Sequence, residues 1–211
     1  MVIVNYRTPD LLEKAADSFR LFYPNVDLVI VDNGSNDRSL QVIESLVESN
    51  PEVTKSILLD RNFFHGPAMD LAMSRLKREI AFFLDTDTET ESGGFLELML
   101  RELESDKRVY GVGRVDRVNR RGFADPGGTE VILITAYMML RRKMYFDLPP
   151  FKHHGMPTLE NFSAASAKGY LLNQFEIDRY IKHFGRGTAS RFGYSLGLRG
   201  KLNLVLNKFG L

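Results

Sequence analysis

Residues 81–87, Ala-Phe-Phe-Leu-Asp-Thr-Asp, decide the fold of this chain. An apolar run passes directly into two carboxylates spaced two positions apart. A short, continuous apolar run is typical of a strand buried on both faces of a parallel sheet. Ligands of open α/β sheets bind at the carboxyl ends of such strands. Because a buried carboxylate is costly unless it is paired or coordinates a metal, Asp85 and Asp87 suggest a divalent cation that holds a phosphorylated ligand.

The segments before this strand alternate between two patterns. The apolar runs predict strands and the amphipathic runs predict helices. The expected strands cover residues 1–5, 27–31 and 56–59, and the expected helices cover residues 10–22, 38–49 and 67–78. This alternation predicts an α/β, Rossmann-like fold with a mostly parallel central sheet flanked by helices.

The second half of the chain has a different pattern of apolar and polar residues. We expect helices over residues 91–104 and 158–169, and strands over residues 110–118 and 131–140. A polar, glycine-rich loop separates the two expected strands. No domain-splitting linker is visible, so all 211 residues are expected to form a single domain.

Composition restricts the class of protein. A hydrophobic content of 44% and a charged content of 26% are ordinary for a globular domain. The net charge of +1 argues against a nucleic-acid partner. The chain has no cysteine, which excludes disulfides and thiolate metal sites and fits a cytoplasmic protein. No run approaches the ~20 apolar residues of a membrane span.

Polar residues of particular types follow three of the expected strands. Asp32-Asn33 follows the second strand, Arg61-Asn62 follows the third, and Asp85 and Asp87 follow the fourth. A carboxylate can accept a hydrogen bond from a nucleotide base, and an arginine can stack on the base or neutralise phosphate. Carboxylates at the next strand end can hold a divalent cation against a diphosphate.

With these residues in place, the chain resembles the family 2 glycosyltransferases, which have the A-type nucleotide-sugar-binding fold. The resemblance covers the first ~90 residues in order and spacing. Each motif alone would be weak, but together they are specific. The matching stretches are residues 2–7, 29–37, 61–62, 66–68 and 83–87, with a His–Gly-Thr segment at residues 183–188.

The resemblance implies a role for each matching position. Asp32 would recognise the nucleotide base, Val4 and Tyr6 would form its cradle, and Asn33 would be a further donor-binding position. Asp85 and Asp87 would bind Mn²⁺ or Mg²⁺, with His183 as a further ligand or a diphosphate contact. The remaining positions expected to bind the donor are Arg61, Asn62, Asp70 and Thr86.

The chain departs from the family pattern in its acceptor half. Most members carry an acidic pair before a helix, and one of these acids is the catalytic base. Here that place holds residues 156–160, Met-Pro-Thr-Leu-Glu. Glu160 is the nearest carboxylate and the expected base, and Asp147 is a more distant alternative.

Each of these residues also has a structural interpretation. Residues 32–35 are equally typical of an ordinary strand-to-helix turn. Taken by themselves, Asp85 and Asp87 are also typical of a solvated turn. Glu160 reads as a first-turn acid that responds to the helix dipole. His65, His153 and His154 are expected to be loop or surface histidines.

The chain is expected to divide into a nucleotide-sugar half (1–90), an acceptor half (91–180) and a basic amphipathic C-terminal segment (181–211). Leucines interleave with basic residues in the last segment. Peripheral contact with the inner face of a membrane is one interpretation. Docking on the domain itself, or a self-association surface, is an equally good one.

The resemblance therefore predicts a metal-dependent glycosyltransferase that inverts the anomeric centre. The expected donor is a UDP- or GDP-sugar, and the expected acceptor is a hydroxyl of a glycan or lipid-linked glycan. Two alternatives remain. One is a non-catalytic nucleotide-sugar-binding module, and the other, ranked lower, is a sugar nucleotidyltransferase, which would need a glycine-rich basic loop after the first strand.

Overall fold

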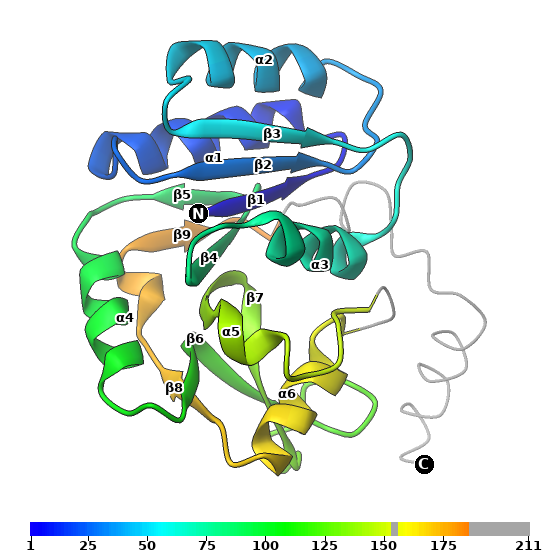
Figure 1. Cartoon of the computed structure of the whole chain (residues 1–211), viewed down its shortest axis with the longest axis vertical. Helices are drawn as coiled ribbons and strands as arrows, with labels where there is room; N and C mark the ends of the chain where they lie inside the picture. The colour runs from blue at the N-terminus through cyan, green and yellow to red at the C-terminus, as the bar shows by residue number, and fades with distance from the viewer. Residues whose placement is uncertain (153–155, 186–211) are drawn as a thin grey trace.

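A seven-stranded sheet organises the computed structural model, which describes residues 1–152 and 156–185 (Figure 1). The strand order is β3-β2-β1-β4-β7-β6-β8, and β7 alone in this sheet runs antiparallel to its neighbours. The mostly parallel sheet expected from the sequence is therefore confirmed. The strands are β1 (Val2–Asn5), β2 (Leu28–Asp32), β3 (Thr54–Leu58), β4 (Ile80–Asp85), β6 (Val109–Val118), β7 (Glu130–Arg141) and β8 (Leu171–Gln174).

The first half of the chain folds as the alternation predicts. The helices α1 (Pro9–Phe22), α2 (Ser39–Ser49) and α3 (His65–Arg75) connect β1 to β4. The arrowheads of β1, β2 and β3 point the same way in Figure 1. The register pairs Asn5 with Asp32, and Val4 with Asp85. The polar residues that end these strands therefore lie along one edge of the sheet.

The second half contains elements that the sequence did not predict. α4 (Phe95–Glu104) begins later than expected, directly after Gly94, which has a φ of +84°. The short strand β5 (Thr88–Thr90) precedes it. β5 pairs with β9 (Ile181–His183) in a separate two-stranded sheet. α6 (Leu159–Ala167) matches the expected helix. The short elements α5 (Arg142–Tyr145), β8 and η1 (Ile177–Arg179) were not expected.

Two apolar cores lie on opposite faces of the sheet. Phe82 and Leu84 of β4 pack into the core built with α1, α2 and α4. Ala81 and Phe83 of the same strand pack into the core built with α3, α5 and α6. This alternation is the consequence of the two-residue side-chain period of a strand. It explains why residues 81–84 are apolar without interruption, and why all four are buried.

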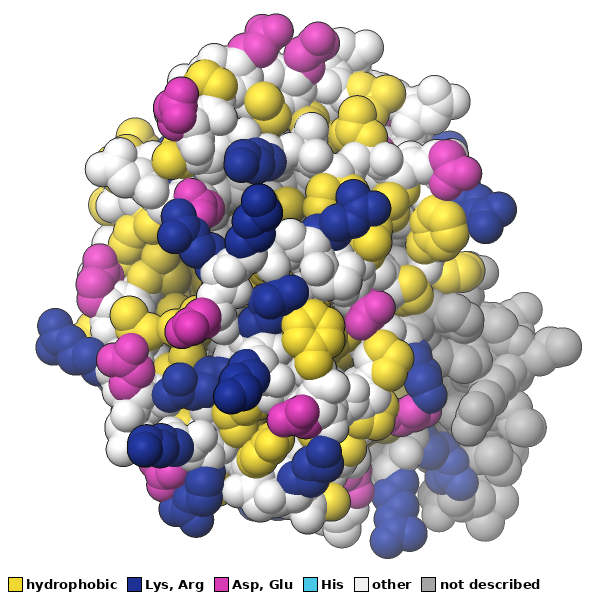
Figure 2. Space-filling view, viewed as in Figure 1, with side chains coloured by type: hydrophobic (Ala, Val, Ile, Leu, Met, Phe, Trp, Pro, Cys, Tyr) yellow, Lys and Arg dark blue, Asp and Glu magenta, His cyan; other side chains and the backbone are white. Residues whose placement is uncertain are grey.

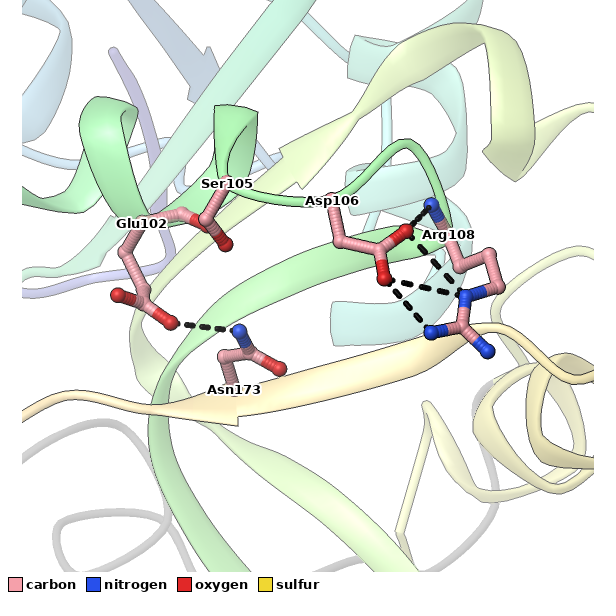
Figure 3. Close-up of polar contacts among 5 residues, drawn as sticks. All are labelled: Glu102, Ser105, Asp106, Arg108 and Asn173. Atoms are coloured by element: carbon pink, nitrogen blue, oxygen red, sulfur yellow. Dashed lines mark hydrogen bonds and ion pairs between the residues drawn. The ribbon is translucent and has the colours of Figure 1, made fainter.

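Polar contacts lie around the edge strand β8, which pairs with β6 at one end of the sheet (Figure 3). Asn173 of β8 donates from Nδ2 to Oε1 of Glu102 on α4, at 2.6 Å. Arg108 donates from Nη2 to Oδ2 of Asp106 at 2.7 Å, within the turn that leads into β6. The second pair is largely exposed, so its net contribution to stability is small. The Glu102–Asn173 bond ties helix α4 to the edge strand.

The surface carries charges of both signs. Figure 2 shows lysine and arginine side chains across the centre of one face, with aspartate and glutamate side chains among and around them. Within the described residues, no helix is long and apolar enough to cross a bilayer. His153, His154 and residues 186–211, which include most of the expected basic C-terminal segment, lie outside the described residues.

Candidate functional site

Three side chains at the carboxyl end of β4 have the donor atoms of a divalent-metal site. Asp85 ends β4, Asp87 lies in the turn that follows, and His183 ends β9. One ligand atom from each lies within 4.8 Å of the others. The pairing of Thr88 with His183 across β5 and β9 brings the histidine here from almost one hundred residues away along the chain.

The three side chains differ in their exposure. Asp87 is 6% exposed, and its Oδ2 lies 3.2 Å from Nε2 of His183. Asp85 is partly exposed, and its Oδ1 lies 3.7 Å from Nε2 of His65 at the start of α3. One side of the cluster therefore faces protein and the other remains accessible. A ligand can reach the cluster from the accessible side.

The electrostatics of this cluster favour a bound cation. Burial raises the pKa of Asp85, and the neighbouring charge of Asp87 raises it further, whereas His65 and His183 oppose the rise. A hydrogen bond to Asp87 is the main cause of the raised pKa of His183. Two carboxylates held together in a poorly solvated place disfavour their own ionisation. A divalent cation between them would remove that penalty.

The donor set is compatible with Mn²⁺ or Mg²⁺. Carboxylate oxygens suit both ions, and an imidazole nitrogen suits transition metals better than Mg²⁺. Two carboxylates and one histidine leave further coordination positions for ligand or water oxygens. The residues present therefore fit the expected metal, and the histidine favours Mn²⁺ over Mg²⁺.

Asp32 is the last residue of β2 and is buried, with 1% exposure. Its Oδ1 accepts from Nδ2 of Asn5 at 2.9 Å and from the Ser35 hydroxyl at 2.5 Å. Its Oδ2 accepts from the backbone N–H of Ser35 at 2.9 Å. An ionised carboxylate has about four acceptor positions. Asp32 therefore organises the turn, and recognition of a base by Asp32 stays a prediction.

The loops after β2 and β3 are locked together. Asn33 donates from Nδ2 to Oδ1 of Asn62 at 3.1 Å, and its own Oδ1 accepts from the backbone N–H of Phe63 at 2.9 Å. Gly34 has a φ of +74°, and a Cβ there would lie 2.4 Å from the backbone carbon of Arg61. Glycine is required at this position by both the conformation and the close approach. The expected donor-binding loops thus form one connected surface.

The other expected donor-binding positions lie on the same edge of the sheet. Arg61 is exposed, and its guanidinium lies 4.8 Å from the ring centroid of Phe63. Val4 is partly buried at the end of β1. Tyr6 is partly buried, and the Arg7 guanidinium lies 5.2 Å from its ring centroid. Aromatic and guanidinium planes of this kind can stack on a nucleotide base.

Thr86, between Asp85 and Asp87, is buried with 5% exposure. Its hydroxyl lies 3.1 Å from the Thr8 hydroxyl, which in turn donates to Oδ1 of Asn5. Thr8 makes no side-chain cap for α1. A threonine just before a helix can cap it, but this hydroxyl instead connects the turn after β1 to the turn after β4. Thr86 therefore fixes the position of its acidic neighbours.

Two expected site residues make other contacts. Asp70 of α3 accepts a hydrogen bond from the hydroxyl of Tyr145, which also accepts from the backbone N–H of Phe151. Glu160 is exposed in the first turn of α6 and forms an ion pair with Lys152. These contacts support the structural interpretation of both acids. Their proposed roles in donor binding and catalysis stay predictions.

Sequence reasoning missed a polar network beside the cluster of Asp85, Asp87 and His183. Arg114 of β6, Tyr137 of β7 and Asp178 of η1 are linked by hydrogen bonds. The Tyr137 ring packs edge-on against the ring of His183, with centroids 6.0 Å apart. Asp178 is separated from Arg114 by 64 positions, so no local pattern identifies the pair.

The comparisons with known proteins agree with this geometry. The Glycosyl transferase family 2 model matches residues 1–165. The chain therefore belongs to glycosyl transferase family 2, as the resemblance of its strand-end motifs implied.

Curated relatives match part of the chain. A protein described as "Putative glycosyltransferases" from Mycobacterium tuberculosis is 38% identical over 82 residues, which are 39% of this chain and 23% of that protein. An undecaprenyl-phosphate 4-deoxy-4-formamido-L-arabinose transferase from Pseudomonas paraeruginosa is 26% identical over 116 residues, or 55% of this chain and 33% of that protein. The chain spans about a quarter to a third of the length of these two relatives.

Solved glycosyltransferases share the fold. A mannosyltransferase from Pyrobaculum calidifontis, in complex with GDP-Man and Mn²⁺, has a TM-score of 0.68 at 16% identity, covering 82% of this chain and 53% of that chain. Glucosyl-3-phosphoglycerate synthase from Mycobacterium tuberculosis, in complex with Mn²⁺, UDP and its product, has a TM-score of 0.62 at 14% identity, covering all of this chain and 79% of that chain. At these identities the likeness shows the fold alone.

Proposed function

We propose that this chain is the nucleotide-sugar-binding and catalytic domain of a metal-dependent glycosyltransferase. It transfers a sugar from a UDP- or GDP-sugar to an acceptor hydroxyl, with inversion of the anomeric centre. The single observation that carries the proposal is the meeting of Asp85, Asp87 and His183 at one strand end. Membership of glycosyl transferase family 2 supports the reaction class.

The chain's own residues account for the binding of the donor. The locked loops after β2 and β3, with Asn33, Asn62 and Arg61, would hold the nucleoside beside Val4 and Tyr6. The cluster at the end of β4 would hold Mn²⁺ or Mg²⁺, which neutralises the leaving diphosphate when bound. Asp87 and Asp85 would orient that ion, and Thr86 would keep the two aspartates in place through Thr8.

The acceptor is proposed more broadly, as a hydroxyl of a glycan or a lipid-linked glycan. Curated relatives described as undecaprenyl-phosphate transferases support a lipid-linked acceptor. Peripheral membrane contact through residues 181–211 stays a prediction from the sequence, because most of that segment lies outside the described residues.

A panel of nucleotide sugars tests the proposal. Thermal stability of the protein is measured with each UDP- and GDP-sugar, in the presence and absence of Mn²⁺. We expect stabilisation by one nucleotide class that depends on Mn²⁺. Equal melting temperatures across the whole panel would contradict donor binding.

A non-catalytic binding module is the second candidate, because the acidic pair typical of the family is absent at residues 156–160. Release of nucleoside diphosphate from the donor that binds separates the two. An enzyme releases it slowly in water and faster with acceptor, whereas a binding module protects the donor.

A further inference from the structure

The network of Arg114, Tyr137 and Asp178 has no part in the function described so far. The Tyr137 hydroxyl donates to Oδ1 of Asp178 at 2.5 Å, and Nη1 of Arg114 donates to the Tyr137 hydroxyl at 3.1 Å. The same Nη1 lies 3.3 Å from Oδ2 of Asp178. Three separate segments of the chain therefore converge on one carboxylate.

This network borders the metal cluster. The Tyr137 ring contacts His183 edge-on, with centroids 6.0 Å apart. The charge of Arg114 lowers the pKa of His183 and so opposes the effect of Asp87. Burial is the main cause of the raised pKa of Tyr137, and the charge of Asp85 raises it further. These interactions place the network next to the ion that would hold the donor diphosphate. The anomeric carbon of the donor is bonded to that diphosphate, so it too lies nearby.

We propose that Asp178 is the catalytic base that takes the proton of the attacking acceptor hydroxyl. This inference rests on the proposed transfer function. Glu160, the base expected from the sequence, is replaced in this role.

The surroundings of Asp178 suit a general base. Its side chain is 51% exposed, so a hydroxyl can reach it. Its orientation is set by Tyr137, which is fully buried, and by Arg114. A carboxylate has about four acceptor positions, and the hydrogen bond from Tyr137 is short while the contacts from Arg114 are long. Oδ2 therefore has an acceptor position left for a substrate hydroxyl.

The other carboxylates expected to belong to the site are engaged elsewhere. Asp32 accepts three hydrogen bonds, from Asn5 and Ser35, and Asp70 accepts from Tyr145. Asp85 and Asp87 belong to the metal cluster. Glu160 forms an exposed ion pair with Lys152, and no contact found among the described residues connects it to that cluster.

The chemical step balances without a further reagent. An oxygen lone pair of the acceptor hydroxyl forms the new bond to the anomeric carbon of the nucleoside diphosphate sugar. The bond from that carbon to the diphosphate oxygen breaks, and its electron pair leaves with the diphosphate. The hydroxyl proton passes to Oδ2 of Asp178 and then to solvent. When water replaces the acceptor, the same step hydrolyses the donor.

Hydrolysis of the donor tests the inference without knowledge of the acceptor. UDP-glucose and GDP-mannose are incubated with Mn²⁺, and the nucleoside diphosphate released is measured. Calorimetric binding of UDP and GDP in the presence of Mn²⁺ is measured in parallel. The variants are D178N, D178A with and without formate, E160Q, and E176Q as the matched control. Glu176 lies two positions from Asp178, is exposed and pairs with Arg179.

We expect D178N to lower the hydrolysis rate by about 10²-fold or more, as loss of a general base does, with nucleotide affinity changed less than about twofold. Formate should restore part of the rate of D178A, because a small carboxylate can occupy the space of the missing one. E176Q should hydrolyse the donor as the wild type does, and E160Q should lose far less of the rate than D178N.

Several results would overturn the assignment. These are a normal rate for D178N, loss of nucleotide binding together with the rate, failure of formate to rescue D178A, or a loss of rate confined to E160Q. Nucleotide binding without hydrolysis by the wild type would also overturn it, in favour of a binding module. Absence of nucleotide binding by the wild type would instead contradict the proposed function itself.

Discussion

Replacement of Asp87 by asparagine separates the metal-binding role of this residue from its role in the fold. Asparagine keeps the shape of the side chain and can keep a hydrogen bond to His183, which lies 3.2 Å away. The variant loses one of the two negative charges of the cluster. It also loses the repulsion between Asp85 and Asp87, which raises the pKa of Asp85 in the wild type. The variant without metal should therefore fold normally.

The loss of Mn²⁺ affinity expected for D87N follows from the distances within the cluster. The ligand atoms lie within 4.8 Å of one another, so an ion between them would lie closer than 4.8 Å to the Asp87 carboxylate. A divalent cation and a unit charge at 4.8 Å interact by about 7 kcal/mol at an effective dielectric constant of ~20, which is therefore a lower bound. Desolvation of the ion offsets part of this energy. We expect at least about 3 kcal/mol to remain, which raises the Kd for Mn²⁺ at least ~100-fold.

Thermal unfolding with Mn²⁺ is the assay. At a Mn²⁺ concentration ~100 times the wild-type Kd, the wild type gains about 2.7 kcal/mol and D87N gains about 0.4 kcal/mol. For a chain of this size these gains correspond to increases in Tm of roughly 5–11 °C and ~1 °C. E89Q is the matched control, since Glu89 lies two positions away and pairs with Lys14. An equal rise in Tm for D87N and the wild type would refute the reasoning.

Three further predictions concern pH and packing. Asp87 raises the pKa of His183 above 6.5, and a proton competes with the metal for the imidazole. The affinity for Mn²⁺ should therefore fall as the pH decreases from about 8 to about 6. A calorimetric affinity that is the same across this range would contradict the prediction. Phe95 is fully buried against Tyr23 and Phe82, so F95A should lower the free energy of unfolding by about 3–5 kcal/mol in urea titrations, and a loss under about 1 kcal/mol would contradict the packing. A Cβ on Gly66 would lie 1.9 Å from the carbonyl oxygen of Lys152, so G66A should lower the free energy of unfolding by about 1–3 kcal/mol. In the control G127A the nearest atom to the new Cβ lies at 3.5 Å, so this variant should be close to neutral. Equal stability of both variants would argue against the close approach at Gly66.

The first half of the fold was predictable from local patterns because its elements are set by local periodicity and turn residues. Residues 81–84 predicted β4 correctly because both of its faces are covered. Asn33 and Gly34 were recognisable as a turn. The same two residues hold the loop after β3, and this contact depends on the sheet order.

The rest of the site depends on contacts that are distant in sequence. β5 and β9 are three residues long and exist through their mutual pairing, so neither has a periodic signal of its own. That pairing explains why His183 reaches Asp87. Family resemblance suggested this histidine, whereas periodicity did not. His65 was expected to be a loop or surface residue, but it lies 3.7 Å from Asp85.

Side-chain roles were less predictable than strand ends. Thr8 stands where a residue commonly caps a helix, yet its hydroxyl bonds to Asn5 and approaches Thr86. Asp178 attracted no attention in the sequence, because its significance comes from Tyr137 and Arg114 on strands far from it along the chain. A single acid in a polar segment has no pattern that distinguishes it from a solvated residue.

The most direct measurement of donor binding by this domain is an anomalous-scattering map from crystals grown with Mn²⁺ and UDP or GDP. We expect one manganese peak between Asp85, Asp87 and His183, in contact with the diphosphate oxygens of a nucleotide that lies along the ends of β1, β2 and β4. A well-ordered nucleotide whose diphosphate lies away from these three residues, with no manganese peak among them, would contradict the account.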